Sequence, residues 1–173
     1  MNVVFLCLGG NIGNREGNLN LAISKISQMC GRIISSSSIY ETDAWGSYSS
    51  LKYLNQVVQI HTKMDANELL KTLLNIEIEL GRQRTSNQNA DRIIDIDILF
   101  FNDEIINLPH IQIPHPRLHL RNFVLKPFSE INEAFLHPQL KKNIKELLLE
   151  CPDSLTLSLF KKKIVFFFNF LFF

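Results

Sequence analysis

Two aspartates, Asp95 and Asp97, stand in the most strand-like segment of the chain, DRIIDIDILFF at residues 91–101. Aspartate is depleted in β-strands, and a buried carboxylate is costly without a partner. Side-chain alternation puts both carboxylates on one face, about 7 Å apart, where they repel by roughly 2 kcal/mol at an effective dielectric near 20. A divalent cation would offset this repulsion, and hard oxygen ligands favour Mg²⁺ over Zn²⁺. Aspartates at the solvated end of an edge strand, paired with arginines, would give the same pattern, and the pair alone supports both interpretations equally.

Basic side chains flank this pair on both sides. The polar loop before the aspartates carries Arg82, Arg84 and Arg92. After the strand, the stretch PHPRLHLR places a base at every second position of a segment that is expected to be extended: His115, Arg117, His119 and Arg121. Arginine binds phosphate oxygens bidentately through its planar fork. A solvated basic face is the usual explanation of such residues, but bases on either side of paired carboxylates indicate a site for a metal ion and phosphate.

Glu77 is a second carboxylate in an unusual place, near the centre of the apolar face of a helix expected at residues 66–80. A carboxylate there needs a partner. It could reach the helix end and pair with Arg82 or Arg84, or it could face a ligand pocket above the sheet. We favour the second interpretation.

Two further patterns bear on ligand binding. The turn GGNIGN at residues 9–14 fits neither the P-loop nor the Rossmann spacing, so phosphate binding is left to basic side chains and a metal ion. In the strand YLNQVV, Tyr53 and Asn55 share one face. An aromatic ring beside an amide suits a flat heterocycle, although ordinary sheet surface would give the same pattern.

The elements that must position these residues follow from periodicity and turn signals. Strands are expected at residues 3–8, 32–42, 53–62 and 93–101, and helices at 15–30, 66–80 and 141–150. Asp65, with Glu68 three residues later, predicts a capping box at the start of the second helix. The order β-α-β-β-α-β predicts an α+β, ferredoxin-like sandwich with a mainly antiparallel sheet, helices on one face and a C-terminal extension.

The bulk composition excludes several classes of protein. A net charge of +1, from 18 Lys+Arg against 17 Asp+Glu, gives no overall field for nucleic acid or a membrane surface. Cys7, Cys30 and Cys151 lack CxxC spacing and are expected to be reduced thiols of a cytoplasmic protein. The length suits one domain, expected at residues 1–157, and a monomer is the default expectation.

The C-terminal residues differ in composition from the rest of the chain. Residues 160–173 hold seven of the 13 phenylalanines, and we expect residues 158–173 to form a Phe/Lys-rich tail outside the fold. The ten residues 164–173 are too few to span a bilayer, which needs about 20. No membrane span is therefore expected.

Five segments, in this order and spacing, resemble the 6-hydroxymethyl-7,8-dihydropterin pyrophosphokinase family: GGNIGNREGNLNLA, YLNQVV, IEIELGRQR, DRIIDIDILFF and IPHPRLHLRNFVLKP. The resemblance covers about residues 2–155, and the combination R-x-x-D-x-D with H-P-R-x-x-x-R-x-F is highly specific. It implies a transferase of folate biosynthesis, an ATP-dependent pyrophosphokinase. Such an enzyme moves the pyrophosphoryl group of ATP to the hydroxymethyl oxygen of the dihydropterin and releases AMP.

The resemblance also implies roles for individual residues. Asp95 and Asp97 would bind two Mg²⁺ ions that bridge the triphosphate of ATP. The catalytic residues would be Arg82 and Arg92, which would close over the phosphates on mobile loops and neutralise charge in the transition state. The other residues at the nucleotide would be Glu77, Arg84, Ile98, His115 and Arg121. The pterin would be surrounded by Thr42, Tyr53, Asn55 and Phe123.

The chain departs from the family pattern directly before Arg92. The family usually carries a basic residue, an aromatic residue and Gly-Pro there, whereas this chain has QNAD at residues 88–91. Asp91 therefore adds a negative charge to the loop that would face the phosphates.

Two other classes of function stay open at this point. One is a different Mg²⁺-dependent phosphotransferase or nucleotidyltransferase, which its products would distinguish. The other is a non-enzymatic, ferredoxin-like RNA-binding module. The aromatic-rich pattern of an RNA-recognition sheet is missing and the net charge is near zero, so we expect small-molecule substrates, ATP and a dihydropterin, and no nucleic acid.

Overall fold

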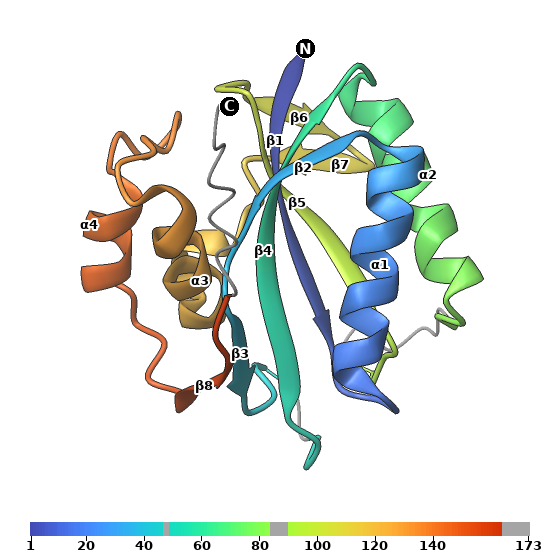
Figure 1. The fold of residues 1–173 in the computed structure, drawn as a ribbon. Helices are drawn as coiled ribbons and strands as arrows, with labels where there is room; N and C mark the ends of the chain where they lie inside the picture. Colours follow the sequence, from blue (N-terminus) through green and yellow to red (C-terminus); the bar gives the residue numbers. More distant parts are fainter. Residues whose placement is uncertain (47–48, 84–89, 164–173) are drawn as a thin grey trace, which may run out of the picture.

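The computed structural model describes residues 1–46, 49–83 and 90–163 (Figure 1). A 3₁₀ turn at Leu118–Leu120 precedes the third helix. The elements in chain order are β1 (Asn2–Gly10), α1 (Arg15–Met29), β2 (Arg32–Ser36), β3 (Ile39–Thr42), β4 (Tyr53–Thr62), α2 (Ala66–Glu79), β5 (Asp95–Phe101), β6 (Ile106–Leu108), β7 (Ile111–Ile113), α3 (Asn122–Asn132), α4 (Ile144–Leu149) and β8 (Leu157–Lys161).

The main sheet is antiparallel in every pairing and has the strand order β5-β1-β4-β3-β8, with β2 also paired to β4. The predicted second strand is split into β2 and β3, because Ser37 leaves the strand line and its side chain accepts a hydrogen bond from the Val57 amide, 3.0 Å away. Both halves still pair with β4, so the ferredoxin-like order is confirmed. The capping box of Asp65 and Glu68 at the start of α2 is also confirmed.

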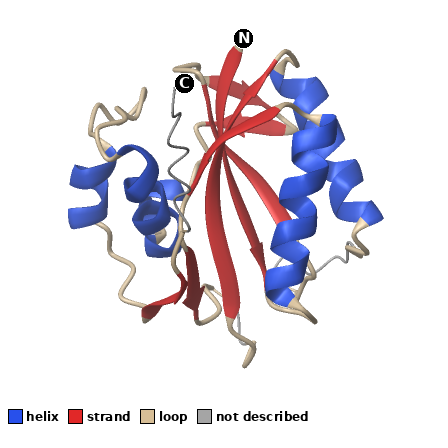
Figure 2. Cartoon of the chain, viewed as in Figure 1, coloured by secondary structure: helices blue, strands red, loops and turns tan. Residues whose placement is uncertain are grey.

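The two helices of the ferredoxin-like order lie on one face of the sheet, as predicted, and the C-terminal extension adds two helices on the other face. Helices α1 and α2 lie on one side of the sheet, and α3 and α4 lie on the other (Figures 1 and 2). Helix α3 was not among the helices expected from the sequence, and Pro127 lies inside it. Proline lacks an N–H to donate, but the rest of the helix packs well enough to tolerate one missing bond.

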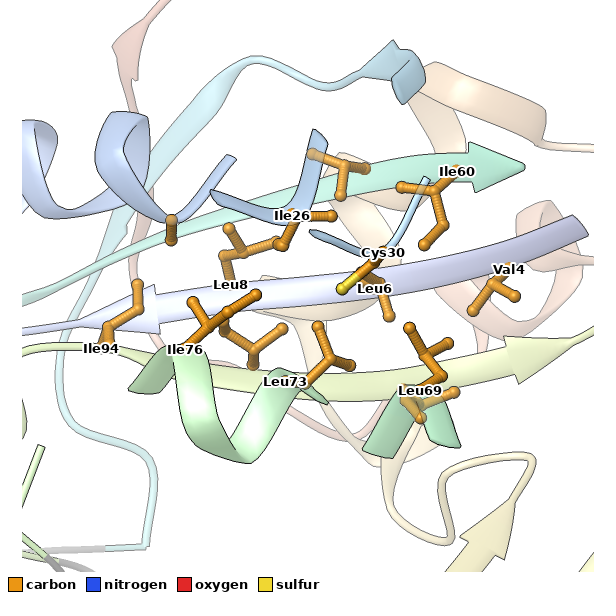
Figure 3. Close-up of a cluster of buried hydrophobic side chains, with 14 of the residues drawn as sticks. Val4, Leu6, Leu8, Ile26, Cys30, Ile60, Leu69, Leu73, Ile76 and Ile94 are labelled. Carbon is orange, nitrogen blue, oxygen red and sulfur yellow. The ribbon is translucent and has the colours of Figure 1, made fainter. Parts of the chain in front are cut away.

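Alternation along β1 divides the core between these two layers. Val4, Leu6 and Leu8 point toward α1 and α2, where they meet Ile26 and Ile76 (Figure 3). The residues between them on β1 point to the opposite face, where a second cluster packs on α3 and α4: Phe5, Cys7, Val57, Leu99, Phe100, Leu118, Val124, Leu125, Phe128, Ile144 and Leu147. Strand β1 is therefore buried on both faces, and this close packing holds the position of its C-terminal end.

The fold extends beyond the boundary expected at residue 157. Residues Leu157–Lys161 form β8, which pairs antiparallel with β3 at the edge of the sheet. Lys161 forms an ion pair with Glu16, and the Arg15 guanidinium lies 5.8 Å from the centre of the Phe160 ring. Residues 158–161 thus belong to the sheet, whereas residues 164–173 of the predicted tail lie outside the described residues.

The cysteines and the helices of the described part of the chain bear on two further expectations, reduced thiols and the lack of a membrane span. All three cysteines are free, as expected for reduced thiols. None of the described helices has the length and apolar character that crossing a bilayer requires.

The second core layer yields a test of stability. Phe128 is fully buried, and its ring centre lies 4.6 Å from that of Phe5 and 5.5 Å from that of Phe100. Phe128→Ala should lower the free energy of unfolding by about 3–5 kcal/mol, measured by urea denaturation. Leu149→Ala, at a side chain that is 80% exposed, is the control and should change it by less than about 0.5 kcal/mol. Equal effects of the two substitutions would contradict the packing of α3 on the sheet.

Candidate active site

The site lies at the end of the sheet where β1 finishes and β4 and β5 begin. Cross-strand pairing places Asn55, Gly9 and Asp95 in one row, and Cys7 opposite Asp97 in a neighbouring row. A Cβ on Gly9 would lie 2.8 Å from the Asn55 side-chain oxygen. Glycine therefore leaves the middle of the row open, so that the polar side chains on either side of it face one shared space.

A cavity of about 350 Å³ opens over these rows. Most of the predicted site residues line it: Thr42, Tyr53, Asn55, Glu77, Arg82, Arg92, Asp95, Asp97, Ile98, His115, Arg121 and Phe123. The remaining predicted residue, Arg84, lies outside the described residues. The structure thus brings the predicted set together, and the role of each member stays a prediction.

The carboxylate of Asp95 lies between two guanidinium groups. One oxygen accepts from Arg82 Nη1 and the other from Arg92 Nη1. The same Arg82 nitrogen lies 2.6 Å from Glu77 Oε1. The two arginines that are predicted to bind phosphate therefore neutralise a predicted metal ligand, and a cation at Asp95 would compete with them.

Both interpretations of Glu77 apply: it pairs with an arginine at the helix end, and it faces the cavity. Its side chain is 1% exposed, it lines the cavity, and it pairs with Arg82 as the alternative interpretation required. Its Oε1 atom also accepts a hydrogen bond from the Ile96 amide of edge strand β5, at 2.7 Å. A buried carboxylate with a cation and a backbone donor is satisfied, so Glu77 ties α2 to the strand that carries the aspartates.

Asp97 faces a second pair of bases. Its Oδ2 atom lies 3.8 Å from Arg121 Nη1 and 3.9 Å from His115 Nε2. Burial and then the Asp95 carboxylate raise the pKa of Asp97, while Arg121 opposes them. Burial, followed by Arg121 and Arg117, lowers the pKa of His115 to about 4, so this imidazole is neutral at pH 7.

The donor set fits magnesium in one particular way. Among the residues that the structure describes, no group of three or more His, Cys, Asp and Glu side chains could enclose a metal ion. Asp95 and Asp97 supply two hard carboxylates at the cavity, and Mg²⁺ is commonly held by one or two carboxylates together with substrate phosphates and water. The site therefore suits a cation that arrives with a phosphate ligand, not a closed structural metal site.

The residues that are predicted to bind the pterin line the same cavity. The Asn55 amide donates to Thr42 Oγ1 at 3.0 Å, which fixes the orientation of the amide. The guanidinium of Arg92 lies 5.8 Å from the centre of the Tyr53 ring. A flat heterocycle would find an oriented amide and aromatic faces here.

Sequence reasoning missed Trp45, which lines the cavity from the loop after β3. Its ring centre lies 4.8 Å from the Arg121 guanidinium, 5.9 Å from that of Arg117 and 6.5 Å from the Phe123 ring centre. The signal was a single tryptophan in an otherwise polar loop. The other cavity residues that were missed are Cys7, Gly9, Asp43, Leu70, Leu74, Ile96 and His110, whereas Arg117 belongs to the basic segment that the sequence singled out.

The sequence predicted that the segment PHPRLHLR is extended, but the structure shows that only part of it is. The 3₁₀ turn at Leu118–Leu120 interrupts the alternation. As a result His115, Arg117 and Arg121 line the cavity, and His119 is not among the lining residues.

An antiparallel α+β sheet that carries paired carboxylates, several arginines and an aromatic-lined cavity at one end defines a site of the phosphotransferase type. Residues 5–133 match the family model described as 7,8-dihydro-6-hydroxymethylpterin-pyrophosphokinase (HPPK). The chain belongs to the HPPK family.

Curated relatives agree with this assignment. The chain is 37% identical over 142 residues to 2-amino-4-hydroxy-6-hydroxymethyldihydropteridine pyrophosphokinase of Porphyromonas gingivalis, covering 80% of this chain and 96% of that protein. It is 41% identical over 131 residues to the protein of the same name from Bacillus subtilis, covering 75% and 78%.

Solved structures share the fold. The chain superposes on wild-type Plasmodium falciparum HPPK-DHPS with SDX-DHP with a TM-score of 0.70 at 20% identity, covering 87% of this chain and 43% of that chain. The chain thus spans less than half the length of that protein, and the likeness concerns the fold alone.

Trp45 gives an optical test of the cavity, because it is the only tryptophan of the chain. A ligand that contacts Arg121 or Phe123 should change the surroundings of the indole, so the tryptophan emission should shift or be quenched when MgATP is added. Leu51→Ala, in the same loop, should keep this response. Unchanged emission at MgATP concentrations where calorimetry detects binding would contradict the placement of Trp45.

Proposed function

We propose that the chain transfers the pyrophosphoryl group of ATP to the hydroxymethyl oxygen of 6-hydroxymethyl-7,8-dihydropterin and releases AMP, as a step of folate biosynthesis. Family membership supports the reaction. The observation that carries it is the convergence of Asp95 and Asp97 with Arg82, Arg92 and Arg121 at one cavity. Carboxylates for a divalent cation and guanidinium groups for phosphate oxygens are what this chemistry requires.

The two aspartates and the arginines near them would bind the triphosphate of ATP. Asp95 and Asp97 would hold two Mg²⁺ ions, which supply neutralisation of charge on the phosphate oxygens when bound. Arg82 and Arg92, which contact Asp95, would bind the oxygens of the transferring group when the aspartates hold the metal ions. The other nucleotide contacts would come from Glu77, Arg84, Ile98, His115 and Arg121.

The pterin side would use Thr42, Tyr53, Asn55 and Phe123. The Asn55 amide, already oriented by Thr42, would bond the edge of the ring, and the two aromatic side chains would contact its faces. Holding the hydroxymethyl oxygen in line with the β-phosphate needs no covalent intermediate on the protein. Positioning and preorganised charge would therefore supply the catalysis.

We further infer that the substrates are small molecules, and a cytoplasmic, monomeric protein stays the expectation from its sequence.

The test of the function is a product assay. Purified chain with ATP and Mg²⁺ should form AMP only when 6-hydroxymethyl-7,8-dihydropterin is present, and EDTA should stop the reaction. Release of pyrophosphate instead of AMP would indicate nucleotidyl transfer. A folded chain that binds MgATP but forms no pterin-dependent AMP would refute the proposed reaction.

Arg82→Ala tests the role of the arginine that bridges Glu77 and Asp95. We expect kcat to fall by about 100-fold or more, with a much smaller change in the KM for ATP, because the guanidinium stabilises charge that develops on the transferring group. Arg82→Lys, which keeps a cation near Glu77, controls for damage to the fold, and melting temperature is recorded for both variants. An effect confined to ATP affinity would contradict the role.

A further inference from the structure

Asn11 bonds the segment before β5 through both atoms of its amide. The residue follows β1 in the turn GGNIGN and is 4% exposed. Its Nδ2 atom donates to Asp91 Oδ1 at 2.6 Å, and its Oδ1 atom accepts from the Arg92 amide at 2.8 Å. Its own backbone amide donates to the Arg92 carbonyl at 2.9 Å. The backbone of Arg92 is thus bonded on both sides by one residue of the glycine turn.

The turn is built for this close approach. A Cβ on Gly10 would lie 2.2 Å from the Ile93 carbonyl oxygen, a distance that backbone atoms cannot accommodate. Glycine therefore allows the two segments to touch, and Asn11 then bonds across the contact.

Asp91 directs its charge toward this turn. Hydrogen bonds from Ser49 and Asn11 lower the pKa of its carboxyl group. Asn11 Nδ2 also lies 3.4 Å from Ser49 Oγ, so the loop between β3 and β4 meets the same point. The charge that the sequence places beside Arg92, where the family usually has Gly-Pro, is thus held by the turn and the neighbouring loop. This accounts for a carboxylate being tolerated next to a phosphate-binding arginine.

We propose that Asn11 and Asp91 are positioning residues for Arg92. Together with the Arg92 backbone they form a clamp that fixes the peptide of Arg92 while its guanidinium is exchanged between Asp95 and the phosphates. The hydrogen bond between Asp91 and Asn11 thereby restrains the residue directly before Arg92. The inference rests on the proposed function, because it assigns the clamp to an arginine of that reaction.

The test exchanges the two partners. Asn11→Asp removes the Nδ2 donor and sets two carboxylates against each other, while its oxygen can still accept from the Arg92 amide. We expect kcat to fall by about 10- to 100-fold, the value of one hydrogen bond to a charged group, with little change in the KM for the pterin. The double variant Asn11→Asp with Asp91→Asn restores a donor and an acceptor at the same net charge as the wild type, and kcat should recover.

A double-mutant cycle separates positioning from general stability. If Asn11 acts through Arg92, Asn11→Asp should cost nothing further in kcat once Arg92→Ala is present. Repulsion between the two carboxylates of Asn11→Asp should separate the turn from Asp91 and weaken the bond to the Arg92 amide, so hydrogen exchange of this amide should be slow in the wild type, faster in Asn11→Asp and slow again in the double variant. Asn107→Asp, the same change at an exposed position of β6, is the matched control and should alter neither measurement.

The outcomes decide the proposal in each case. Failure of the exchanged pair to restore both kcat and slow exchange would overturn it, as would an undiminished effect of Asn11→Asp in the Arg92→Ala background. If Asn11→Asp does not fold, Asp91→Ala removes the same bond without repulsion and should speed exchange of the Arg92 amide. If the wild type forms no pterin-dependent AMP, the proposed function fails, and the exchange measurements still decide the clamp.

Discussion

The carboxylate of Asp95, shared between Arg82 and Arg92, is the interaction around which the rest of the site is arranged. Two carboxylates on one face of a strand repel, and their charges need cations wherever they are partly withdrawn from water. The structure meets this need from both sides: two guanidinium groups contact Asp95, and the Arg121 guanidinium lies near Asp97. The positive charges of Arg82, Arg92 and Arg121 thus offset the negative charges of the paired aspartates.

The remainder of the fold holds this balance in place. One face of β1 anchors the core under α1 and α2, and the other carries the aromatic cluster under α3. Buried Glu77 connects α2 to the edge strand that bears the aspartates, through the Ile96 amide and Arg82. The glycine turn after β1 holds the backbone of Arg92. Each of the two arginines is thus tied to a different rigid element, although both meet at one carboxylate.

More of the site than of the fold could be predicted from the sequence, and the reason lies in how each feature affects a periodic pattern. Asp95, Asp97 and Glu77 were recognisable because polar groups on apolar faces break a periodic pattern. Trp45 breaks no pattern, since a loop has no period, and only its contacts with Arg121 and Phe123 bring it into the site. Helix α3 was hidden by Pro127, and β8 by the unusual composition of the residues that follow it. Tertiary packing decided both elements, and local propensity does not contain that information.

The most direct measurement is equilibrium binding of Mn²⁺, as a probe for Mg²⁺, followed by electron paramagnetic resonance with and without ATP. We expect weak binding to the protein alone, because Arg82 and Arg92 compete for Asp95, and much tighter binding of two ions when ATP is present. Asp97→Asn should weaken the ATP-dependent binding. Mn²⁺ binding that is the same with and without ATP, or indifferent to Asp97→Asn, would contradict the assignment of the paired aspartates as a site for a metal ion and phosphate.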